Sequence, residues 1–553
     1  MNPLFVADGP VVSSSRWFSA WLALICGVFL PGPLLPAPLF AQAAPAPPGP
    51  AISADLLLQG GLLVDGRGAE PRLGDVAIRG ERIVAVGTFP LGTIGEIVDC
   101  RGLVVAPGFI DLHNHSDSQV VDRQTRANVN FLMQGCTTIV TGNCGSGPVL
   151  AGEYYDQIDR ERCGTHVAHL LPQGSLRERV VGLAQRPPTV EELAQMEALA
   201  DQAMREGAWG VSSGLIYVPS SYADTAELTA VARPVGRHRG LYVSHIRGEG
   251  VQLLKAVNEA LEIGRDAGAA VHISHFKSTG QEAWGLVREA AKLVEQARGN
   301  GQLVTADQYP YIASSTSLEA TILPTWAREG GSAQLRQRLQ DPDQKARLDA
   351  AMDEALRRAD QGARIRIARH APHPEYAGKS LAELAQAQGQ APLQVATQIL
   401  LDGGAAVVNF GMHEDDVRHV MTLPWVATAS DGRAYLPGAD RPHPRSYGTF
   451  PRKIGHYAQR EGVISLAHAI RSCTTLPAEI LGLTDRGRLQ VDQVADVVVF
   501  HPQDFVDTAS YDDPHQYPQG LKHVLVAGQK AVWRGVPTGG LYGSALRRRL
   551  PTE

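Results

Sequence analysis

The sequence predicts an α/β protein, a (β/α)8 TIM-like barrel with a small β-sandwich domain built from both chain ends and a helical insertion before the last two barrel strands. Short apolar runs alternate with helical patterns through the middle of the chain. Short β-branched runs with Gly-containing turns occur near both ends. The 553 residues, 44% hydrophobic and 20% charged, suffice for one large barrel with an appendage.

The β-rich segments at the two ends are expected to form one domain. Residues 54–106 contain "LLLQGGLLVDGRGAE", "GDVAIRGERIVAVG" and "EIVDCRGLVVAPG", and residues 485–553 contain "GRLQVDQVADVVVFHP" and "LKHVLVAGQKAVWRG". Each segment is too small to bury a core alone, so we expect the two to pack into a shared β-sandwich. The barrel is then expected to occupy residues 107–484.

The alternation expected of a barrel runs through this middle segment. Apolar runs such as "CTTIVTGN", "LYVSHIRGE", "AAVHISHFK" and "LVTADQYPY" are separated by helical patterns such as "TVEELAQMEALADQAMREG" and residues 253–267. Charged helical patterns interrupt the alternation from about residue 325 to 395, and we interpret them as an insertion and a candidate lid. The last two barrel strands are then expected in "AAVVNFGMHE" and "WVATASDG".

The first fifty residues predict export. An Arg precedes an apolar run at 17–30, prolines follow, and the Ala-Gln-Ala at 41–43 fits a small-x-small cleavage pattern. We interpret residues 1–43 as a secretory signal and 44–53 as a flexible lead-in, so the mature chain is expected in the periplasm or outside the cell. One alternative is a membrane anchor, for which the run is short; another is a lipoprotein signal at Cys26, where the preceding Ile replaces the expected small residue.

Composition argues against several kinds of partner. A formal charge of −6 without any Lys/Arg run gives no sign of nucleic-acid binding. Beyond the signal no apolar stretch approaches transmembrane length, so we expect no membrane span in the mature chain. Cleavage would remove one of the six cysteines, and the odd number left means that at least one thiol stays unpaired or binds a metal.

Polar residues with metal-ligand chemistry follow successive apolar runs. In chain order they are His113, His115, Cys144, His245, His275 and Asp431. A barrel carries its chemistry at the carboxyl ends of its strands, so these side chains are expected at one rim. Because a strand repeats every two residues, His113 and His115 point to the same side. Each residue alone would more often be structural, but together they form a ligand set that zinc accepts.

Longer motifs carry a family resemblance. They are "APGFIDLHNHSD", "TGNCG", "GVSSGLIYVPSSYADTAEL", "YVSHIRGE", "ISHFK", "DQYPY", "ATASDG", "HPRSYGTFPR" and "GRLQVDQVADVVVF". These motifs resemble the N-acyl-D-amino-acid deacylases, or D-aminoacylases, of the metal-dependent amidohydrolase superfamily, from about Ala54 to Leu550. His-x-His is shared across the superfamily, whereas Gly-Asn-Cys-Gly together with His-x-Arg and Ser-His-x-Lys is typical of this family.

The resemblance implies a zinc centre. It implies that Cys144, His245 and His275 hold one zinc tightly, and that His113 and His115 complete a second, weaker position bridged by Cys144. Many superfamily members bridge two metals with a carboxylated lysine on the fourth strand, but the stretch "GAWGVSSGLIYVPSS" contains no lysine. Cys144 is therefore the better bridging candidate, and a zinc-bound thiolate would account for an unpaired cysteine in an exported protein.

The resemblance also suggests roles in amide hydrolysis, which needs an activated water, a sink for the oxyanion charge and a proton for the leaving amine. A bound zinc supplies the first two. Asp431 is expected to take the proton from the water and return it to the nitrogen, although "SDG" alone would be an ordinary turn. The resemblance favours Arg445 as the partner of the substrate α-carboxylate, with Lys277 and Tyr309 in support. Arg247, which follows His245 by two residues as Lys277 follows His275, is a weaker candidate. The histidines left unassigned are His272, His413, His443 and His456.

The expected function is zinc-dependent hydrolysis of N-acyl-D-amino acids, small-molecule substrates that yield a carboxylate and a free D-amino acid. One alternative is an amidohydrolase acting on another linear amide, such as a D-residue dipeptide. An alternative of another class is an inactive barrel retained as a binding protein, against which the complete ligand set argues. The chain departs from the family at Gln173 in "LLPQGSLRE", where Gly-His-Gly is common, and this puts a substrate-pocket contact in doubt.

Overall fold

The computed structural model describes residues 49–549. The predicted signal at 1–43 lies outside the described residues, so export stays a prediction. The first strand begins at Ile52, two residues before the predicted start of the β-rich segment. Between residues 49 and 549 no helix combines the length and the apolarity that a bilayer crossing requires.

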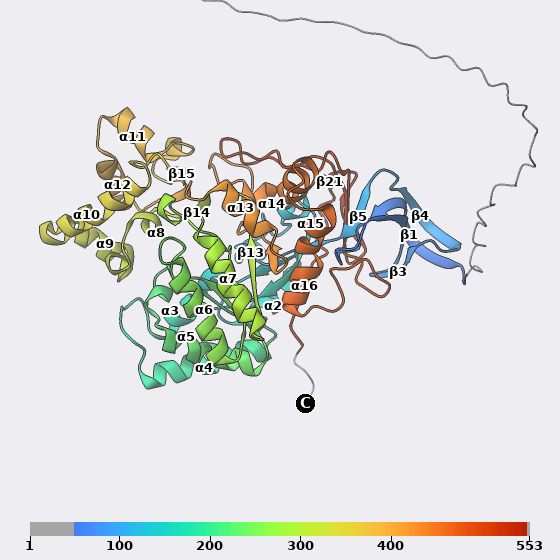
Figure 1. Cartoon of the computed structure of the whole chain (residues 1–553), viewed down its shortest axis with the longest axis horizontal. Coiled ribbons are helices and arrows are strands. Elements are labelled where there is room, and N and C mark those ends of the chain that lie inside the picture. Colours follow the sequence, from blue (N-terminus) through green and yellow to red (C-terminus); the bar gives the residue numbers. More distant parts are fainter. Residues whose placement is uncertain (1–48, 550–553) are drawn as a thin grey trace, which may run out of the picture. The chain divides into compact units, whose positions relative to one another are not determined.

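Parallel strands form two sheets at the centre of the described part of the chain (Figure 1). Their orders are β6-β7-β8 and β9-β10-β11-β12-β13-β17. The bounds are β6 Phe109–Asp111, β7 Cys136–Thr141, β8 His166–His169, β9 Leu171–Pro172, β10 Gly210–Gly214, β11 Leu241–His245, β12 Ala270–Ile273, β13 Val304–Gln308 and β17 Val426–Thr428. Leu170 alone separates β8 from β9, and Asn114 forms a parallel bridge to Gly432. This order is what a barrel requires, while barrel closure itself stays a prediction.

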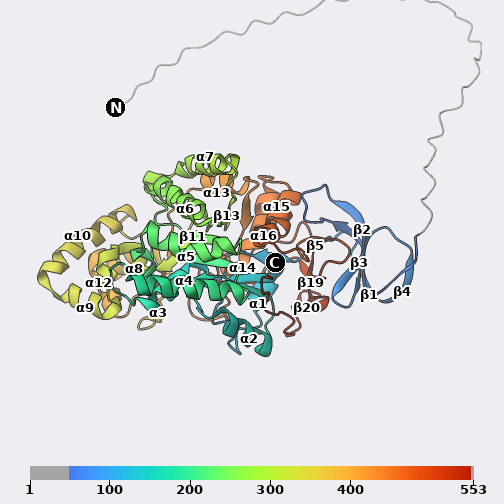
Figure 2. The ribbon, with the colours of Figure 1, turned by 90° about the horizontal axis from the view of Figure 1, so that it is seen from below.

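Amphipathic helices follow most of these strands, and consecutive helices α4 to α7 pack side by side (Figure 2). The helix α6 buries Leu253, Val257 and Leu261 on one face, and its carboxyl end is capped by Gly268, whose φ of 67° suits a residue without a Cβ. The bounds are α1 Val129–Leu132, α2 Ala151–Glu161, α3 Gln173–Val180, α4 Val190–Arg205, α5 Thr225–Arg237, α6 Leu253–Ala267, α7 Leu286–Gly299, α13 Glu414–Met421, α14 Arg445–Pro451, α15 Leu466–Cys473 and α16 Thr475–Leu481.

The β-rich segments near the two ends of the chain join in one nine-stranded sheet, as predicted. Its path is β21-β20-β19-β18-β5-β1-β2-β3, with β4 paired to β1. The bounds are β1 Ile52–Leu63, β2 Arg72–Arg79, β3 Arg82–Gly87, β4 Leu91–Asp99, β5 Val104–Pro107, β18 Val497–Phe500, β19 Leu521–Val526, β20 Gln529–Trp533 and β21 Val536–Pro537. Strand β5 joins the ends because it pairs with both β1 and β18. A two-layer sandwich stays a prediction, since the pairing gives a single sheet.

The insertion is larger than predicted and contains its own sheet. Strands β14 Ser314–Ser317, β15 Ile365–Arg369 and β16 Ala406–Asn409 form it, with β16 antiparallel to both others. The prediction that "AAVVNFGMHE" is a barrel strand is therefore wrong, and β17 alone follows the insertion. A buried four-residue apolar run looks the same in sequence whether it joins a large parallel sheet or a small antiparallel one.

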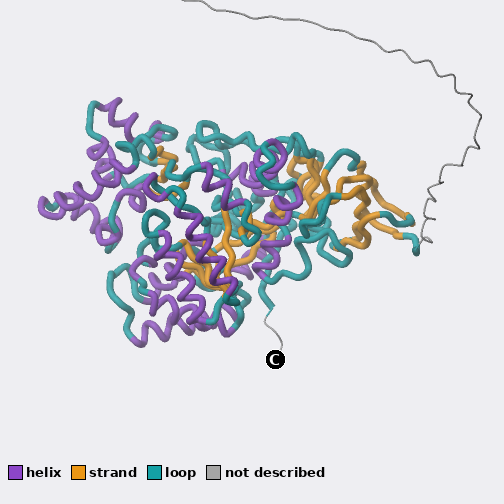
Figure 3. The backbone as a smooth tube through the Cα atoms, in the orientation of Figure 1, coloured by secondary structure: helices purple, strands orange, loops and turns teal. Residues whose placement is uncertain are grey.

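The helices of the insertion enclose a separate hydrophobic core. They are α8 Leu318–Ile322, α9 Gly331–Gln340, α10 Pro342–Arg358, α11 Leu381–Gln388 and α12 Pro392–Leu401. Leu348, Met352 and Leu356 of α10 pack with Val395 and Ile399 of α12 in a cluster distinct from the barrel core. Figure 3 shows these helices gathered away from the strands of the nine-stranded sheet.

The separate core predicts that the insertion can be destabilised by itself. Met352→Ala should weaken it by about 2–5 kcal/mol, because a fully buried side chain is removed. Hydrogen exchange measured by mass spectrometry should rise in α10 and α12 and stay unchanged in α6. The exposed Asp353→Ala is the control. An equal loss of protection in α6 would contradict a separate core.

Candidate metal centre

Three of the predicted site residues have left-handed backbone at the ends of their strands. Cys144 lies in a single 3-10 turn after β7 with φ 52°, His275 follows β12 with φ 37°, and Asp431 follows β17 with φ 50°. Residues other than glycine rarely adopt this region, and such strain collects at functional sites. The turns bring all three side chains toward one point.

The predicted ligands converge. Cys144 Sγ lies 3.2 Å from His113 Nε2, 3.7 Å from His245 Nδ1 and 3.9 Å from His275 Nε2. His115 Nε2 lies 3.0 Å from Asp431 Oδ1. Three overlapping groups each keep their donor atoms within 4.8 Å of one another; they are His113–His115–Cys144, Cys144–His245–His275 and His113–His275–Asp431. The two triads that share Cys144 are the two positions that the resemblance implies.

The charges around the converging ligands favour the ionised forms of the Cys144 thiol and the Asp431 carboxyl group. Burial by itself would raise the pKa of Cys144, but His113 and the hydrogen bonds from neighbouring imidazoles hold it well below its usual value. Burial likewise opposes ionisation of Asp431, and Arg445 with His113 lowers its pKa well below the ordinary range. The site therefore offers anionic donors of the kind that a divalent cation binds.

A close backbone contact explains why the cysteine occupies this place. Gly214 ends β10, and a Cβ there would lie 2.0 Å from the carbonyl oxygen of Cys144. No side chain fits at that strand end, so the Cys144 turn itself fills the space above β10. The stretch "GAWGVSSGLIYVPSS", which contains no lysine, thus also has a backbone arrangement that excludes a long side chain at Gly214.

Two carboxylates that the sequence analysis missed, one buried and one half-buried, support the histidines. Asp307, the fourth residue of β13, accepts a 2.6 Å hydrogen bond from the amide of His275 and lies 3.4 Å from His113 Nδ1. Glu249 lies 2.8 Å from His275 Nδ1 and accepts a 2.5 Å hydrogen bond from Lys277. Such carboxylates orient imidazole ligands and fix their tautomers. The only sequence signal was an acidic residue close to each strand end.

A third carboxylate fastens the two sides of the site together. Asp111 accepts hydrogen bonds from the amide and hydroxyl of Ser430 and from the side chain of Asn114. Burial raises its pKa to about 6. Because Ser430 precedes Asp431 and Asn114 lies between His113 and His115, this contact fixes the His-x-His turn against the Asp431 loop.

The predicted carboxylate-binding residues gather beside the donors. Arg445, the first residue of α14, places its guanidinium 4.7 Å from the ring centre of Tyr309 and 2.7 Å from Asp431 Oδ2. Lys277 Nζ lies 5.6 Å from the same ring centre. The buried hydroxyl of Tyr309 has no hydrogen-bond partner among residues 49–549. Unpaired buried donors require an explanation, and a ligand acceptor supplies one.

The remaining candidates have other roles. The prediction that Arg247 contacts the substrate is wrong. Its guanidinium binds Glu259 and the carbonyl oxygens of Ser221 and Ala223. In a continued strand, a side chain two residues after His245 would point to the same side as His245, but β11 ends at His245, so this alternation does not extend to Arg247.

Of the unassigned histidines, His443 supports the site indirectly. Its Nδ1 accepts a hydrogen bond from the amide of Arg445 and its Nε2 lies 2.9 Å from the carbonyl oxygen of Ala313. His443 thereby fixes the start of α14. Gln173, where the chain departs from the family, is buried and accepts a hydrogen bond from Ser220, and it does not line the cavity over the donors.

A cavity of about 950 Å³ opens above the donors. Its floor includes His115, Cys144, Asp431 and Arg445, and its wall includes residues 315–317 and 403–406 of the insertion. The size suits a small organic ligand. The insertion therefore forms part of the cavity wall, and its action as a lid stays a prediction.

Comparison with known proteins places this site in a family. Residues 96–532 match the amidohydrolase family. The chain belongs to that family. This amidohydrolase is 35% identical over 517 residues to a D-aminoacylase of Alcaligenes xylosoxydans xylosoxydans. The alignment covers 89% of this chain and 98% of the relative. It is 34% identical to an N-acyl-D-glutamate deacylase of the same organism, over 89% of this chain and 96% of the relative.

Solved structures agree with the sequence relatives. A crystal structure of D-aminoacylase superposes with a TM-score of 0.78 at 32% identity, over 90% of this chain and all of the other. The N-acyl-D-glutamate deacylase of Bordetella bronchiseptica, complexed with zinc and a phosphonate mimic of the tetrahedral intermediate, superposes with a TM-score of 0.77 at 32% identity and the same coverage. The resemblance found in the sequence is confirmed, and the α/β fold of the amidohydrolase matches that of D-aminoacylase.

The donor cluster predicts a measurable dependence of metal binding on Cys144. Cys144→Ala should weaken zinc binding by at least ~100-fold, because loss of a ligand costs more than loss of a supporting contact. Zinc bound to the purified amidohydrolase, measured by plasma mass spectrometry after dialysis, tests this. Cys473→Ala, which removes a buried free thiol outside the cluster, should retain its metal. A Cys144→Ala protein with full zinc content would exclude the assigned centre.

Proposed function

We propose that this amidohydrolase is a zinc-dependent N-acyl-D-amino-acid deacylase. The observation that carries the proposal is the convergence of four histidines and Cys144 with Asp431, directly beside the paired Arg445 and Tyr309. The relatives named D-aminoacylase and N-acyl-D-glutamate deacylase support the substrate class and the D configuration. A related D-aminoacylase structure has a binuclear metal centre, which supports metal dependence.

The donor chemistry fits zinc. A thiolate, imidazole nitrogens and a carboxylate are zinc ligands, and Cys144, His245 and His275 would hold the tight ion, with His113 and His115 for a second. When bound, zinc supplies a Lewis acid that polarises the acyl carbonyl and lowers the pKa of water. The residues of the chain then have three tasks: to receive a proton, to return it, and to hold the substrate.

Asp431 is the residue placed to move the proton. Its carboxylate is buried, ionised, and within 3.0–3.4 Å of His115 and His113, so it faces the position where water and the scissile carbon must meet. An ionised carboxylate can accept the proton of the attacking water and then donate it to the leaving nitrogen. Arg445 keeps the carboxylate anionic before substrate arrives.

The free α-carboxylate of the substrate is assigned to Arg445, Tyr309 and Lys277. These side chains supply a guanidinium fork, a buried hydroxyl without a partner and an ammonium group. Charge-assisted hydrogen bonds of this kind fix the orientation of a carboxylate. The scissile amide, one bond from the carboxylate-bearing carbon, then lies over the metal ligands.

A substrate panel tests the proposal. The purified zinc-loaded protein is assayed for amino-acid release from N-acetyl-D-amino acids and from the matched L-isomers. Hydrolysis of D-isomers alone, lost on chelation and restored by zinc, is the expected result. Full activity after metal removal, or hydrolysis confined to L-isomers, would overturn the proposal.

Loss of the proposed base should separate catalysis from metal binding. Asp431→Asn should lower kcat by about 100-fold to 10,000-fold, because a general base and acid is lost. Zinc at Cys144, His245 and His275 should persist, because Asp431 lies outside that triad. Rates and metal content are measured on the same sample. An active, zinc-loaded Asp431→Asn protein would remove the assigned base.

The carboxylate assignment predicts a substrate-dependent loss. For Arg445→Ala, kcat/KM for an N-acetyl-D-amino acid should fall about tenfold to hundredfold more than for its carboxamide, since only the free acid offers a carboxylate to the guanidinium. The comparison cancels the effect of Arg445 on Asp431, which both substrates share. Arg205→Ala on the exposed side of α4 is the control. Equal losses for acid and amide would contradict the assignment.

A further inference from the structure

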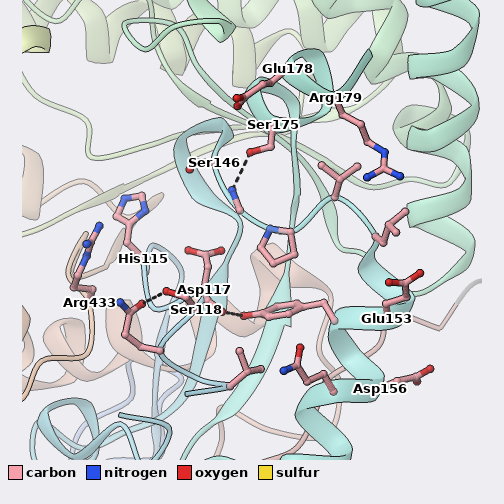
Figure 4. A pocket seen from close by; sticks show the side chains of 18 of the residues that line it. His115, Asp117, Ser118, Ser146, Glu153, Asp156, Ser175, Glu178, Arg179 and Arg433 are labelled. Atoms are coloured by element: carbon pink, nitrogen blue, oxygen red, sulfur yellow. Dashed lines mark hydrogen bonds between the residues drawn. The ribbon is translucent and has the colours of Figure 1, made fainter. Parts of the chain in front are cut away.

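The first three residues of α3 contact the loop that contains Cys144. Ser175 Oγ accepts a 3.2 Å hydrogen bond from the amide of Gly147, which Figure 4 shows as a dashed line that ends on Ser175. Gly174 touches the same loop, since a Cβ on it would lie only 2.6 Å from the carbonyl oxygen of Gly145 and a side chain there would collide. The start of α3 therefore packs directly on the residues that follow Cys144.

A buried hydroxyl connects the start of α3 with the end of β10. The Oγ of Ser220 accepts a 3.1 Å hydrogen bond from the amide of Gly214 and donates one to the side-chain oxygen of Gln173. Gly214 is the residue against which the backbone of Cys144 packs. Ser220 thereby fixes two neighbours of the Cys144 turn, the last residue of β10 and the first residue of α3.

Gln173 is itself held by a buried ion pair. Glu227 of α5 accepts a 3.0 Å hydrogen bond from Nε of Arg177 and a 3.4 Å hydrogen bond from Nε2 of Gln173. Arg177 is fully buried and also donates to two backbone carbonyl oxygens. Buried polar groups that are all paired form a rigid network. Gln173 thus connects a fixed ion pair between α3 and α5 with the turn of Cys144.

An amide side chain suits this place because it offers an acceptor and a donor together. The hydroxyl of Ser220 needs an acceptor for its hydrogen, and an ionised Glu227 needs a donor. The oxygen and the nitrogen of the Gln173 amide meet these two needs. An apolar side chain of the same length would leave both partners without their hydrogen bond inside the protein, whereas an imidazole would again supply one acceptor and one donor.

We propose that Gln173 is a positioning residue for zinc, which acts through Ser220 and the start of α3 to hold Cys144 in its left-handed turn. This rests on the metal centre of the proposed function and adds a residue outside the ligand set. The φ of 52° at Cys144 is strained and has to be maintained by its surroundings. Contacts that orient a metal ligand typically contribute about 10-fold to 100-fold to metal affinity.

The test measures zinc affinity of the purified protein by competition with a chelator. Gln173→Met and Ser220→Ala should each raise the Kd for zinc about tenfold to hundredfold. After loading with Co²⁺, the charge-transfer band between the Cys144 sulfur and cobalt should weaken or shift in both variants. Gln173→His, which restores an acceptor and a donor, should bind zinc within about threefold of wild type. An unchanged Kd and an unchanged cobalt spectrum in Gln173→Met and Ser220→Ala would overturn the inference.

A matched control separates positioning from the loss of any buried hydrogen bond. Thr165 directly precedes β8, and its hydroxyl accepts a 2.9 Å hydrogen bond from the side-chain amide of Asn128 in an equally buried pair. Thr165→Ala should lower the Tm of the metal-free protein as Ser220→Ala does, but should leave the Kd for zinc as in wild type. An equal loss of zinc affinity in Thr165→Ala would overturn the inference.

Kinetics distinguish this role from a substrate contact and from failure of the proposed function. In Gln173→Met at limiting zinc, kcat for an N-acetyl-D-amino acid should fall and recover in excess zinc, while KM stays as in wild type. A raised KM at full zinc occupancy would assign Gln173 to the substrate, so the inference would be wrong while the deacylase function stands. If the wild-type protein binds no zinc, the proposed function fails and the inference fails with it.

Discussion

The site depends on the left-handed turn that ends β7. Cys144 has φ 52° between Gly142 and Gly145, and this conformation aims its sulfur at three imidazoles from three other strands. A regular continuation of the strand would carry the side chain past them. The turn is supported from below by Gly214, whose lack of a Cβ lets the backbone of Cys144 approach. Local strain is thus tolerated because packing on every side leaves no other arrangement.

Charge balance is the second constraint on this interior. Cys144, Asp431, Asp307 and Glu249 all favour their ionised forms despite burial, because imidazoles, Lys277 or Arg445 lie next to each of them. Such a network is costly when one member is missing and rigid when all are satisfied. The same charges therefore hold the ligands in place and prepare the site for a cation. The same contacts therefore stabilise the fold and form the site.

Most of the candidate metal ligands could be predicted from the sequence, but the residues that support them could not. Strand ends in a parallel arrangement meet at one edge, so successive polar residues such as His245 and His275 could be placed together before any coordinates were known. Asp307 and Glu249 carry no comparable signal, because an acidic residue within or after a strand is common. The sheet that contains β16 was predicted wrongly, since its partners β14 and β15 lie far away in the chain and only their pairing distinguishes an insertion strand from a barrel strand. The prediction that Arg247 contacts the substrate was wrong, because β11 ends at His245 and the alternation of side chains stops there.

The last described residues lie along strands made much earlier in the chain. Gly543 pairs with Cys163 and Ala545 with Val167, beside β8, while β18 covers the edge of β5. During synthesis these partners leave the ribosome hundreds of residues after the strands they cover, so the nascent polypeptide carries unpaired edges until residues 543–545 emerge. Co-translational assembly of the strands around β8 must therefore be provisional, and removal of residues 543–545 would leave hydrogen-bonding groups of β8 open to association with other chains.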